Sequence, residues 1–167
     1  MASGAHSLGY VLFEVSDLEA WDRFLTRVVG VVRGEALGGD LVPYRTDERV
    51  ARIFLRRGPA DDLIALGFEV ESEQVMHELS SHVRSAGHPI DPGTDEEAEA
   101  RGIAGFVRTH EPGGVAIEVF HGPALAAQPF GSEPVANGFV TGDLGAGHVA
   151  LRAESIAQTR TFFEQVL

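Results

Sequence analysis

The chain has 167 residues, of which 44% are hydrophobic and 23% are charged, a composition typical of a globular protein with a sizeable core. Its formal net charge of −12 at pH 7 disfavours nucleic acid and anionic membrane surfaces as partners. Because no cysteine is present, disulfides, zinc-thiolate sites, iron–sulfur clusters and thiol catalysis are excluded. The N-terminus lacks a signal-peptide pattern and no apolar run approaches the roughly 20 residues of a membrane span, so we expect a cytoplasmic protein.

The first predicted unit is a strand, a helix and three further extended segments. Residues 8–15 are apolar and aromatic, which predicts a buried strand. Ser16 followed three residues later by Glu19 predicts a helix N-cap, and Gly30 predicts the end of that helix. We expect the inward face of the helix to carry Leu18, Trp21, Leu25 and Val28, with Phe24 beside them. The extended segments, separated by turn residues, are 31–37, 41–46 and 50–56.

The second predicted unit has the same order of elements. Residues 63–70 predict a strand, and residues 73–86 predict an amphipathic helix. The inward face of that helix is expected to carry Val75, Met76, Leu79 and Val83. The acidic stretch 91–101 contains glycine and proline and predicts an exposed loop. Segments 106–109 and 115–120 predict two strands joined by a tight turn.

A segment rich in proline and alanine follows the second unit. Residues 122–137 predict a domain linker, after which a glycine-rich stretch leads into a third unit. We expect a strand at 147–151 and a helix at 155–167. Only one strand of its own unit covers the apolar face of that helix. We therefore expect this face to be buried against the first part of the chain or a neighbouring chain, or to be poorly ordered.

One histidine, His148, stands at the start of the third predicted strand. In a strand of period two it shares a face with Ala150, whereas Val149 and Leu151 share the other face. The imidazole is thus placed beside a small neighbour, as a metal ligand that faces a cavity would be. The same local pattern is typical of an ordinary core or surface histidine, and both interpretations stay open at this point.

The three units repeat one another. Phe13-Glu14-Val15 recurs as Phe68-Glu69-Val70 at a spacing of 55 residues, and each copy leads into an amphipathic helix. The third unit matches the first at a spacing of 138 residues, which places Gly9 on Gly147 and Val11 on Val149. The order of elements repeats along with the residues. This favours true repetition over a chance similarity between amphipathic units.

Four stretches carry a likeness to a known family, namely 8–18, 61–70, 113–123 and 139–149. The most specific is the crossover, which reads Phe139-Val140-Thr141-Gly142-Asp143 and then Gly147-His148-Val149. Two βαβββ units to a domain are the pattern of the vicinal oxygen chelate superfamily. Within it the chain resembles the type I extradiol ring-cleaving dioxygenases, the 2,3-dihydroxybiphenyl dioxygenase group, over nearly its whole length.

The resemblance implies an α+β fold of tandem βαβββ modules, as in glyoxalase, bleomycin-resistance protein and dihydroxybiphenyl dioxygenase. Residues 1–123 would form the N-terminal domain, with modules at about 8–58 and 63–123. Residues 124–146 would be the linker and crossover. Residues 147–167 would be the first strand and helix of a C-terminal catalytic domain.

The resemblance also implies extradiol cleavage of a catecholic aromatic with O₂ at a non-haem Fe(II), with Mn(II) as the alternative metal. In this family the histidine that matches His148 is the first of three iron ligands. Fe(II) that binds both an organic substrate and O₂ needs open positions, which two histidines and one carboxylate leave free. The implied partners are a small aromatic diol and O₂. The net charge predicts no nucleic acid or membrane partner, and the partly covered face of helix 155–167 predicts a homo-oligomer.

The chain departs from the family because it ends at Leu167, midway through the third unit. The family's other two ligands and its acid–base residues lie beyond that point, so no catalytic residue is assigned. The repeat places Tyr10 and Ala65 at the positions equivalent to His148, and Glu118 lies where a carboxylate ligand would. One such ligand does not hold iron. We therefore expect no metal in the N-terminal half, and neither stoichiometric iron nor catechol cleavage from the 167-residue chain alone.

Three alternatives remain open, namely a glyoxalase-type isomerase, a metal-free binding module of the bleomycin-resistance kind and a purely structural piece. We expect the other histidines to be solvated structural residues: His6, His77, His82, His88, His110 and His121. If the modules pair as in the family, strands 8–15 and 63–70 are central and related by a pseudo-twofold axis. A charge at Val11 or Phe68 should then unfold the domain.

Overall fold

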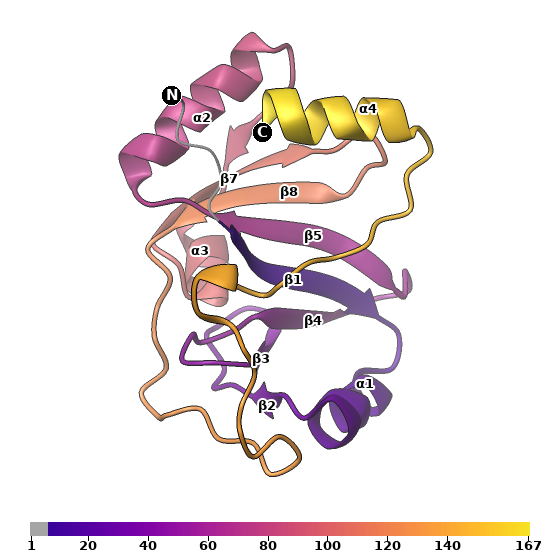
Figure 1. Cartoon of the computed structure of the whole chain (residues 1–167), viewed down its shortest axis with the longest axis vertical. Coiled ribbons are helices and arrows are strands. Elements are labelled where there is room, and N and C mark those ends of the chain that lie inside the picture. The colour runs from indigo at the N-terminus through magenta and orange to yellow at the C-terminus, as the bar shows by residue number, and fades with distance from the viewer. Residues whose placement is uncertain (1–6) are drawn as a thin grey trace.

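The structure is a computed structural model, and it describes residues 7–167. The described residues form one eight-stranded mixed sheet with the order β2-β3-β4-β1-β5-β8-β7-β6 (Figure 1). The strands are β1 (Ser7–Val15), β2 (Val32–Arg33), β3 (Val42–Arg45), β4 (Ile53–Arg57), β5 (Asp62–Glu69), β6 (Asp91–Pro92), β7 (Gly105–His110) and β8 (Ala116–His121). The helices are α1 (Leu18–Phe24), η1 (Leu25–Val29), α2 (Glu73–Ser85), α3 (Asp95–Arg101), η2 (Gly142–Leu144), α4 (Ile156–Thr161) and η3 (Phe162–Val166).

The sheet consists of two equivalent halves. The strand order is β2-β3-β4-β1 in module one and β6-β7-β8-β5 in module two. Each module closes with a parallel pair, β1 with β4 and β5 with β8, and the modules join through the antiparallel pair of β1 and β5. The expected βαβββ repeat, with two central strands related by a pseudo-twofold axis, is confirmed.

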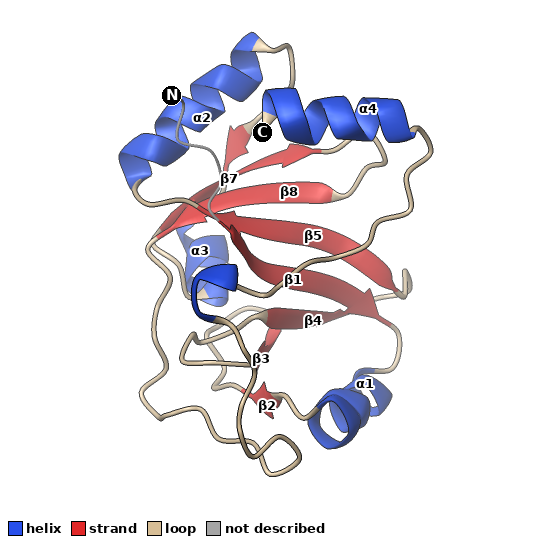
Figure 2. Ribbon diagram, in the orientation of Figure 1, coloured by secondary structure: helices blue, strands red, loops and turns tan. Residues whose placement is uncertain are grey.

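The two faces of the sheet carry separate cores, because successive side chains of a strand point to opposite sides. One face, which we call the outer face, packs against α2 and the C-terminal helix formed by α4 and η3 (Figure 2). Its buried residues include Leu66, Met76, Leu79, Val83, Ile117, Val119, Phe162 and Val166. The opposite face, which we call the inner face, packs against α3. Its buried residues include Tyr10, Leu12, Phe54, Ala65, Ala98 and Phe120.

The cap of α1 differs from the expected one. Asp17, not Ser16, is the N-cap, and its carboxylate accepts a hydrogen bond from the Ala20 backbone N–H at 2.9 Å. The Ser16 hydroxyl instead donates to Asp61, the residue directly before β5, at 2.7 Å. A serine that finds a partner across the sheet is no longer available to its own helix, so the cap moves by one residue.

The far end of α1 widens into the π-turn η1 before the helix ends at Gly30, where φ is +85°. The end at Gly30 is as expected, because glycine accepts a left-handed conformation. A π-turn adds one residue to the turn, which shifts the inward position by one. Val29 therefore packs in the core, whereas Val28, expected to point inward, is 70% exposed.

The acidic stretch 91–101 is not the exposed loop that we expected, because it contains β6 and the helix α3. Thr94 and Glu97 form a capping box, in which the Thr94 hydroxyl accepts from the Glu97 backbone N–H and the Glu97 carboxylate accepts from the Thr94 backbone N–H. The acidic first turn also complements the helix dipole. Ala98 and Ala100 are buried against the inner face. The two alanines were therefore a sign of a helix, which the many acidic residues of this stretch made hard to recognise.

Residues 122–137, which we call the strap, lie along module one. The Arg45 guanidinium donates to the Gln128 carbonyl oxygen at 2.9 Å. The Ser132 hydroxyl donates to the carbonyl oxygen of Gly30 at 2.5 Å. The segment expected to be a linker is thus fastened to the module that it passes.

The third unit forms its helix but not its strand. Residues 147–151 run extended across the outer face without pairing with any strand of the described sheet, so the expected strand is wrong for this structure. A strand needs a neighbour for its backbone hydrogen bonds, and no described strand supplies one here. Helix α4 follows the N-cap Ser155 and continues into a π-turn, as α1 does.

The apolar side of the C-terminal helix is divided between burial and exposure. Phe162 and Val166 are buried against the outer face, which confirms that the first part of the chain covers this side of the helix. Ile156, at the start of the helix, is 78% exposed. Among residues 7–167, no helix is both long and apolar enough to cross a bilayer.

Candidate functional site

The segment that carries His148 is anchored to β1. The Ala146 backbone N–H donates to the Leu8 carbonyl oxygen at 2.7 Å. Gly145, one residue earlier, has a φ of +62°, and a Cβ at this position would collide with the same Leu8 oxygen. Glycine is therefore required at position 145 for the close approach to β1. This contact fixes the position of the chain three residues before His148.

His148 itself is exposed. Ala150 is also exposed, whereas Val149 and Leu151 pack against the core of the outer face, so the expected alternation is kept although no strand forms. The imidazole is open to solvent. Within residues 7–167, no group of three or more His, Cys, Asp or Glu lies together so that it could hold a metal ion. The described residues alone thus do not fit an Fe(II) centre, which needs further ligands.

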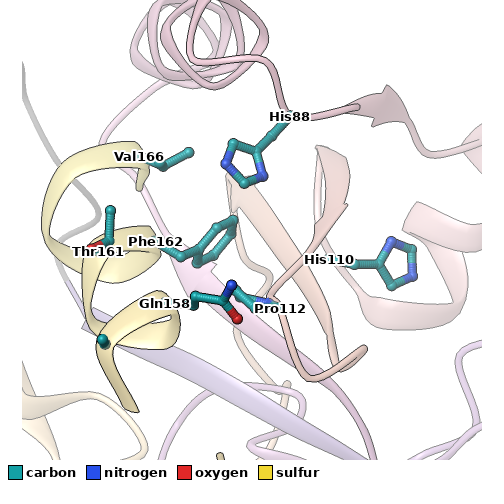
Figure 3. Close-up of a pocket in the computed structure, with 8 residues that line it drawn as sticks. His88, His110, Pro112, Gln158, Thr161, Phe162 and Val166 are labelled. Atoms are coloured by element: carbon teal, nitrogen blue, oxygen red, sulfur yellow. The ribbon is translucent and has the colours of Figure 1, made fainter. Parts of the chain in front are cut away.

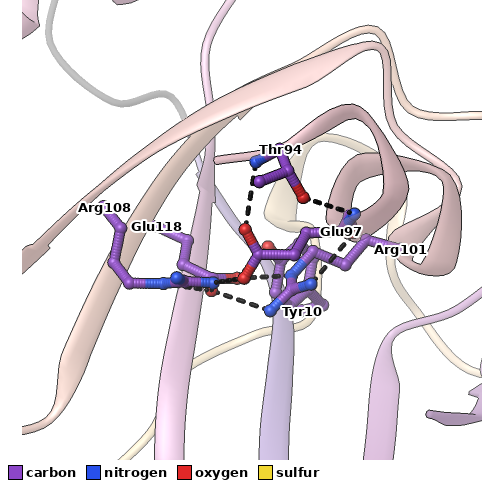
Figure 4. A network of polar contacts seen from close by, with 6 residues as sticks. All are labelled: Tyr10, Thr94, Glu97, Arg101, Arg108 and Glu118. Carbon is purple, nitrogen blue, oxygen red and sulfur yellow. Dashed lines mark hydrogen bonds and ion pairs between the residues drawn. The ribbon is translucent and has the colours of Figure 1, made fainter. Parts of the chain in front are cut away.

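Tyr10, the module-one equivalent of His148, lies in a buried charge cluster (Figure 4). Its hydroxyl donates to Glu118 Oε2 at 2.5 Å. Tyr10 on β1 stands opposite Gly67 on β5, and Gly67 stands opposite Glu118 on β8. A Cβ at Gly67 would collide with the Tyr10 ring. The glycine therefore lets the phenol cross the middle strand and reach the carboxylate.

Glu118 is 1% exposed, and both of its carboxylate oxygens accept hydrogen bonds from arginines. Arg101, the last residue of α3, donates from Nε and Nη2 to the two oxygens at 2.8 and 2.9 Å. Arg108 on β7 donates to Oε1 at 2.8 and 3.0 Å, and it also donates to Glu97 at 2.8 Å. Both guanidinium carbons lie over the Phe106 ring, 4.8 and 5.0 Å from its centroid.

The cluster pairs two carboxylates with two guanidinium groups, so that its formal charges cancel and burial is tolerated. Burial and then the negative charge of Glu118 raise the pKa of Tyr10 well above its ordinary value of 10.0. Hydrogen bonds from the Thr94 backbone and from Arg108 lower the pKa of Glu97. The oxygens of Glu118 are already engaged by arginines and a phenol, so the cluster fastens α3 to the inner face and leaves neither oxygen of Glu118 free for a metal ion.

The other histidines do not converge on one place. His77 and His82 are exposed on α2, and His110 is exposed at the end of β7. His88 is half-buried, with its ring centroid 5.3 Å from that of Phe162, so it is not the solvated residue that we expected. His121 is also half-buried, and His6 lies outside the described residues.

A cavity of about 480 Å³ lies between the C-terminal helix and module two (Figure 3). His88 and Phe162 face each other in it, and His110 stands at its far side. Gln158 and Thr161 of the C-terminal helix complete the polar part of the lining. Its size falls within the range of small-molecule sites, although the lining residues do not form a set of metal ligands.

Comparison with known proteins gives a consistent result. Residues 8–58 match the family described as Dihydroxybiphenyl dioxygenase BphC D1. Over 161 residues the chain is 35% identical to the biphenyl-2,3-diol 1,2-dioxygenase of Pseudomonas sp. strain KKS102, covering 96% of this chain and 55% of that protein. It is also 31% identical to the iron-dependent extradiol dioxygenase of Rhodococcus jostii strain RHA1, covering 96% of this chain and 53% of that protein. A crystal structure of catechol 2,3-dioxygenase superposes with a TM-score of 0.91 at 30% identity, covering 99% of this chain and 56% of the other.

The chain matches the N-terminal part of the extradiol dioxygenases of the vicinal oxygen chelate type. It spans about half the length of the curated relatives that it matches, 55% in the case of the Pseudomonas enzyme. The expected resemblance and the expected tandem βαβββ fold are thereby confirmed. The role of His148 as a metal ligand stays a prediction.

The sequence did not lead us to the arginines of the cluster. Glu118 was singled out as a carboxylate in a ligand position, but Arg101 and Arg108 were read only as parts of a loop and a strand. One signal was present in the Thr94-x-x-Glu97 spacing of a capping box. Recognising that helix would have placed Arg101 in its last turn.

Proposed function

We propose that this chain is the N-terminal half of an extradiol dioxygenase that cleaves a small aromatic diol with O₂ at a non-haem Fe(II), Mn(II) being the alternative metal. The similarity to a biphenyl-2,3-diol 1,2-dioxygenase along nearly the whole chain carries this proposal. The likeness to an iron-dependent extradiol dioxygenase supports the choice of metal. In such a protein the metal supplies the centre at which the diol and O₂ meet.

The proposal assigns separate tasks to parts of the chain. Residues 1–123 are a non-catalytic domain of two modules, and residues 124–146 are the linker and crossover. Residues 147–167 begin the catalytic domain, with His148 as one of its metal ligands. The exposure of His148 supports this assignment, because its imidazole remains open to ligands from elsewhere. The anchor at Gly145 and Ala146 holds the crossover in place.

A chimaera tests the role of His148. Residues 1–167 are joined to the corresponding C-terminal part of the Pseudomonas relative, and iron content and ring cleavage of 2,3-dihydroxybiphenyl are measured. We expect an active, iron-containing protein. The variant His148→Ala should lose its iron and more than about 100-fold in kcat/KM, because loss of an outer-shell partner alone costs about 10–100-fold.

The matched control is His77→Ala, which removes an exposed imidazole from α2, an element outside the crossover. This control should keep the iron and the activity of the chimaera. A His148→Ala protein that is as active as the His77→Ala protein would refute the assignment of His148. A folded chimaera without ring-cleaving activity, although iron is supplied, would contradict the proposed function.

The 167-residue chain alone should neither retain stoichiometric iron after dialysis nor cleave catechols. A single imidazole leaves the remaining coordination positions to water, which gives weak and exchangeable binding. The measurements are metal analysis and oxygen uptake with 2,3-dihydroxybiphenyl and added Fe(II). Steady formation of the yellow ring-opened product would show that the chain completes a site by itself.

The proposal includes a cytoplasmic location and self-association of the chain. Exposed apolar side chains on the crossover and the C-terminal helix support self-association: Val140, Leu144 and Ile156. Light scattering at micromolar concentration should show a species larger than the monomer. A clean monomer that binds no dye specific for apolar surface would count against this part of the proposal.

A further inference from the structure

The loop that precedes His148 is bound to β1 at its C-terminal end. Residues 141–146, which we call the crossover loop, contain the short turn η2 and lie against β1 (Figure 1). At the C-terminal end of the loop, the Ala146 backbone N–H donates to the Leu8 carbonyl oxygen at 2.7 Å. His148 follows two residues after the loop. The place of the crossover loop therefore sets where the chain presents this imidazole.

The N-terminal end of the crossover loop contacts the connection between β3 and β4. The Thr141 hydroxyl forms a hydrogen bond with the carboxylate of Asp47, which lies in this connection, residues 46–52. Asp47 Oδ2 also accepts from Arg52, from Nε at 2.9 Å and from Nη2 at 2.7 Å. Asp47 Oδ1 accepts from the Arg49 backbone N–H at 3.0 Å. One carboxylate thus joins the crossover loop to Arg52.

Arg52 extends this connection to β1. Its side chain is 6% exposed, and its Nη1 donates to the Gly9 carbonyl oxygen at 3.0 Å. The register of β1 against β5 shifts between Leu8 and Tyr10, so Gly9 has no partner in β5 and its carbonyl oxygen is left to the guanidinium. Gly9 follows Leu8, the residue that binds the other end of the loop. Both ends of the crossover loop are therefore connected to neighbouring residues of one central strand.

The connection through Asp47 is ionic. Burial raises the pKa of Asp47, but hydrogen bonds from Arg52, the Arg49 backbone and Thr141 outweigh burial and hold this pKa below its ordinary value. The carboxylate is therefore ionised at neutral pH. Hydrogen bonds with an ionised partner are about twice as strong as those between neutral groups. Thr141 thus donates to a strong acceptor that Arg52 holds in place.

We propose that Thr141, Asp47 and Arg52, which we call the tether, are positioning residues that hold the crossover loop in place for metal binding. They connect its N-terminal end to β1, as the Ala146 amide connects its C-terminal end. The proposal rests on the proposed function, because it assumes that His148 binds the metal. His148 is exposed on a segment without a strand partner, so its place depends on the chain before it. Module one then sets the geometry of a ligand that lies outside the module.

Hydrogen exchange in the 167-residue chain tests the tether. Thr141→Val removes the hydroxyl and keeps the shape of the side chain. We expect the Ala146 amide to exchange about 3–10-fold faster in this variant, measured by NMR, because the loop loses one of its two attachments. The Val70 amide, which donates to the Phe120 carbonyl oxygen at 2.8 Å, should keep its rate, since the fold as a whole is not loosened.

Two further variants control this experiment. Thr141→Ser keeps a hydroxyl and should restore the exchange rate of Ala146. Thr161→Val makes the same chemical change at an exposed threonine of α4 and should leave that rate unchanged. An Ala146 amide that exchanges equally fast in Thr141→Val and in the parent chain would overturn the proposal.

A double variant tests whether Thr141 acts through Asp47. On this proposal Thr141→Val has no bond left to break once Asp47→Ala is present. The exchange rate of Ala146 in the double variant should therefore lie within about twofold of the rate in Asp47→Ala alone. Effects that multiply would show that Thr141 acts independently of Asp47, and they would overturn the tether. If Asp47→Ala does not fold, the comparison of Thr141→Val with Thr141→Ser decides the proposal by itself.

The chimaera with the Pseudomonas relative tests the consequence for the metal. Thr141→Val should release iron to a chelator about 10-fold faster, at the lower end of the 10–100-fold effects of outer-shell partners, and Thr141→Ser should release it at the parent rate. An unchanged release rate from an active Thr141→Val chimaera would overturn the positioning role. The exchange experiment measures neither iron nor ring cleavage. Faster exchange of Ala146 beside an inactive, iron-supplied chimaera would therefore contradict the proposed function and still support the tether.

Discussion

Tyr10 and His148 occupy the same position of the repeated unit, and the structure uses them in opposite ways. Tyr10 is buried on a central strand, and its hydroxyl is bound to a carboxylate that two arginines also hold. His148 is exposed on a segment without a strand partner. The position therefore does not determine the role of a side chain. The role depends on which groups neighbouring strands bring to meet it.

The neighbours of the two residues explain the difference. Gly67 leaves room for the Tyr10 ring, and Arg101 then balances the charge of Glu118. His148 follows a glycine-rich crossover that turns its side chain away from the core. The site of Tyr10 is closed by residues of module two, whereas His148 stays exposed. The following predictions test this contrast, from the largest expected effect to the smallest.

A charge placed on the central strand β5 should unfold the whole chain, and with it the surroundings of both Tyr10 and His148. Phe68 is half-buried on the outer face of β5, with its ring 6.2 Å from Phe163, and Leu66 on the same strand is 1% exposed. Phe68→Asp should destabilise the chain by several kcal/mol, and Leu66→Asp by more than about 4 kcal/mol, because each buries an unpaired charge. Urea unfolding followed by circular dichroism measures both. The control Leu66→Met conserves volume and should cost less than about 1.5 kcal/mol. A soluble Phe68→Asp protein with an unchanged Tm would contradict the strand assignment.

Removing an arginine from the charge cluster around Glu118 should cause the next largest loss of stability. Arg101→Ala takes the bidentate partner from buried Glu118, and loss of one member of a buried ion pair costs about 3–5 kcal/mol. The exposed pair of Arg160 and Glu164 provides the control, since Arg160→Ala should cost no more than about 0.5 kcal/mol. Chemical denaturation compares the two. Equal costs would mean that the charge cluster does not hold α3 in place.

A side chain at Gly67 should displace the Tyr10 ring, because the ring occupies the space that the glycine leaves. Gly67→Ala places a methyl group against the Tyr10 ring and should cost about 1–3 kcal/mol through overpacking. Tyr10→Phe removes the hydroxyl and should cost about 1–2 kcal/mol. If the glycine serves the phenol, the double variant should cost less than the sum of the two single ones. Strict additivity in this cycle would separate Gly67 from Tyr10.

The two tyrosines of the chain should resist ionisation. Burial raises the pKa of both Tyr10 and Tyr44, reinforced by the carboxylates of Glu118 and Asp22 respectively. The folded state then holds protons that the unfolded state loses above about pH 10, so the stability that the two hydroxyls contribute is constant below that pH and falls as the pH rises further. Tyrosinate absorbance should appear only together with the loss of circular dichroism. Ionised tyrosine in a protein that is still folded would show that the hydroxyls are reachable by solvent.

The smallest effect belongs to the open site. His148→Ala changes an exposed side chain, so the free energy of unfolding of the 167-residue chain should change by no more than about 0.5 kcal/mol. Thermal and urea unfolding check this expectation. A loss of about 1 kcal/mol or more would show that His148 contributes to the packing of the chain.

The sequence was most informative where local pattern and repetition agree. The apolar runs 8–15 and 63–70, together with their shared Phe-Glu-Val ending, were enough to predict the two central strands, and the family resemblance supplied their pairing. The helix face failed at Val28 because a π-turn changes the period, which no pattern of apolar residues reveals. The strand at 147–151 failed because strand formation depends on a neighbour.

The candidate site was predictable in part for a similar reason. His148 was named from its glycine-rich context together with the family resemblance, and its role stays a prediction, whereas Glu118 was named from its place on the last strand of module two. The link between Glu118 and Arg101 depends on how α3 folds back over the sheet. The acidic sequence of α3 concealed that helix, so Arg101 could not be placed beside Glu118 before the structure was known.

The strap bears on the time course of folding. Its bonds from Ser132 to Gly30 and from Arg45 to Gln128 join residues 102 and 83 positions apart in the chain. Such contacts close long loops, and they can form only after module one offers a folded surface. Interactions made late lie on the native side of the folding barrier, so weakening them hastens unfolding and leaves the rate of folding almost unchanged. The strap thus governs how long the folded state lasts, not how quickly it is reached.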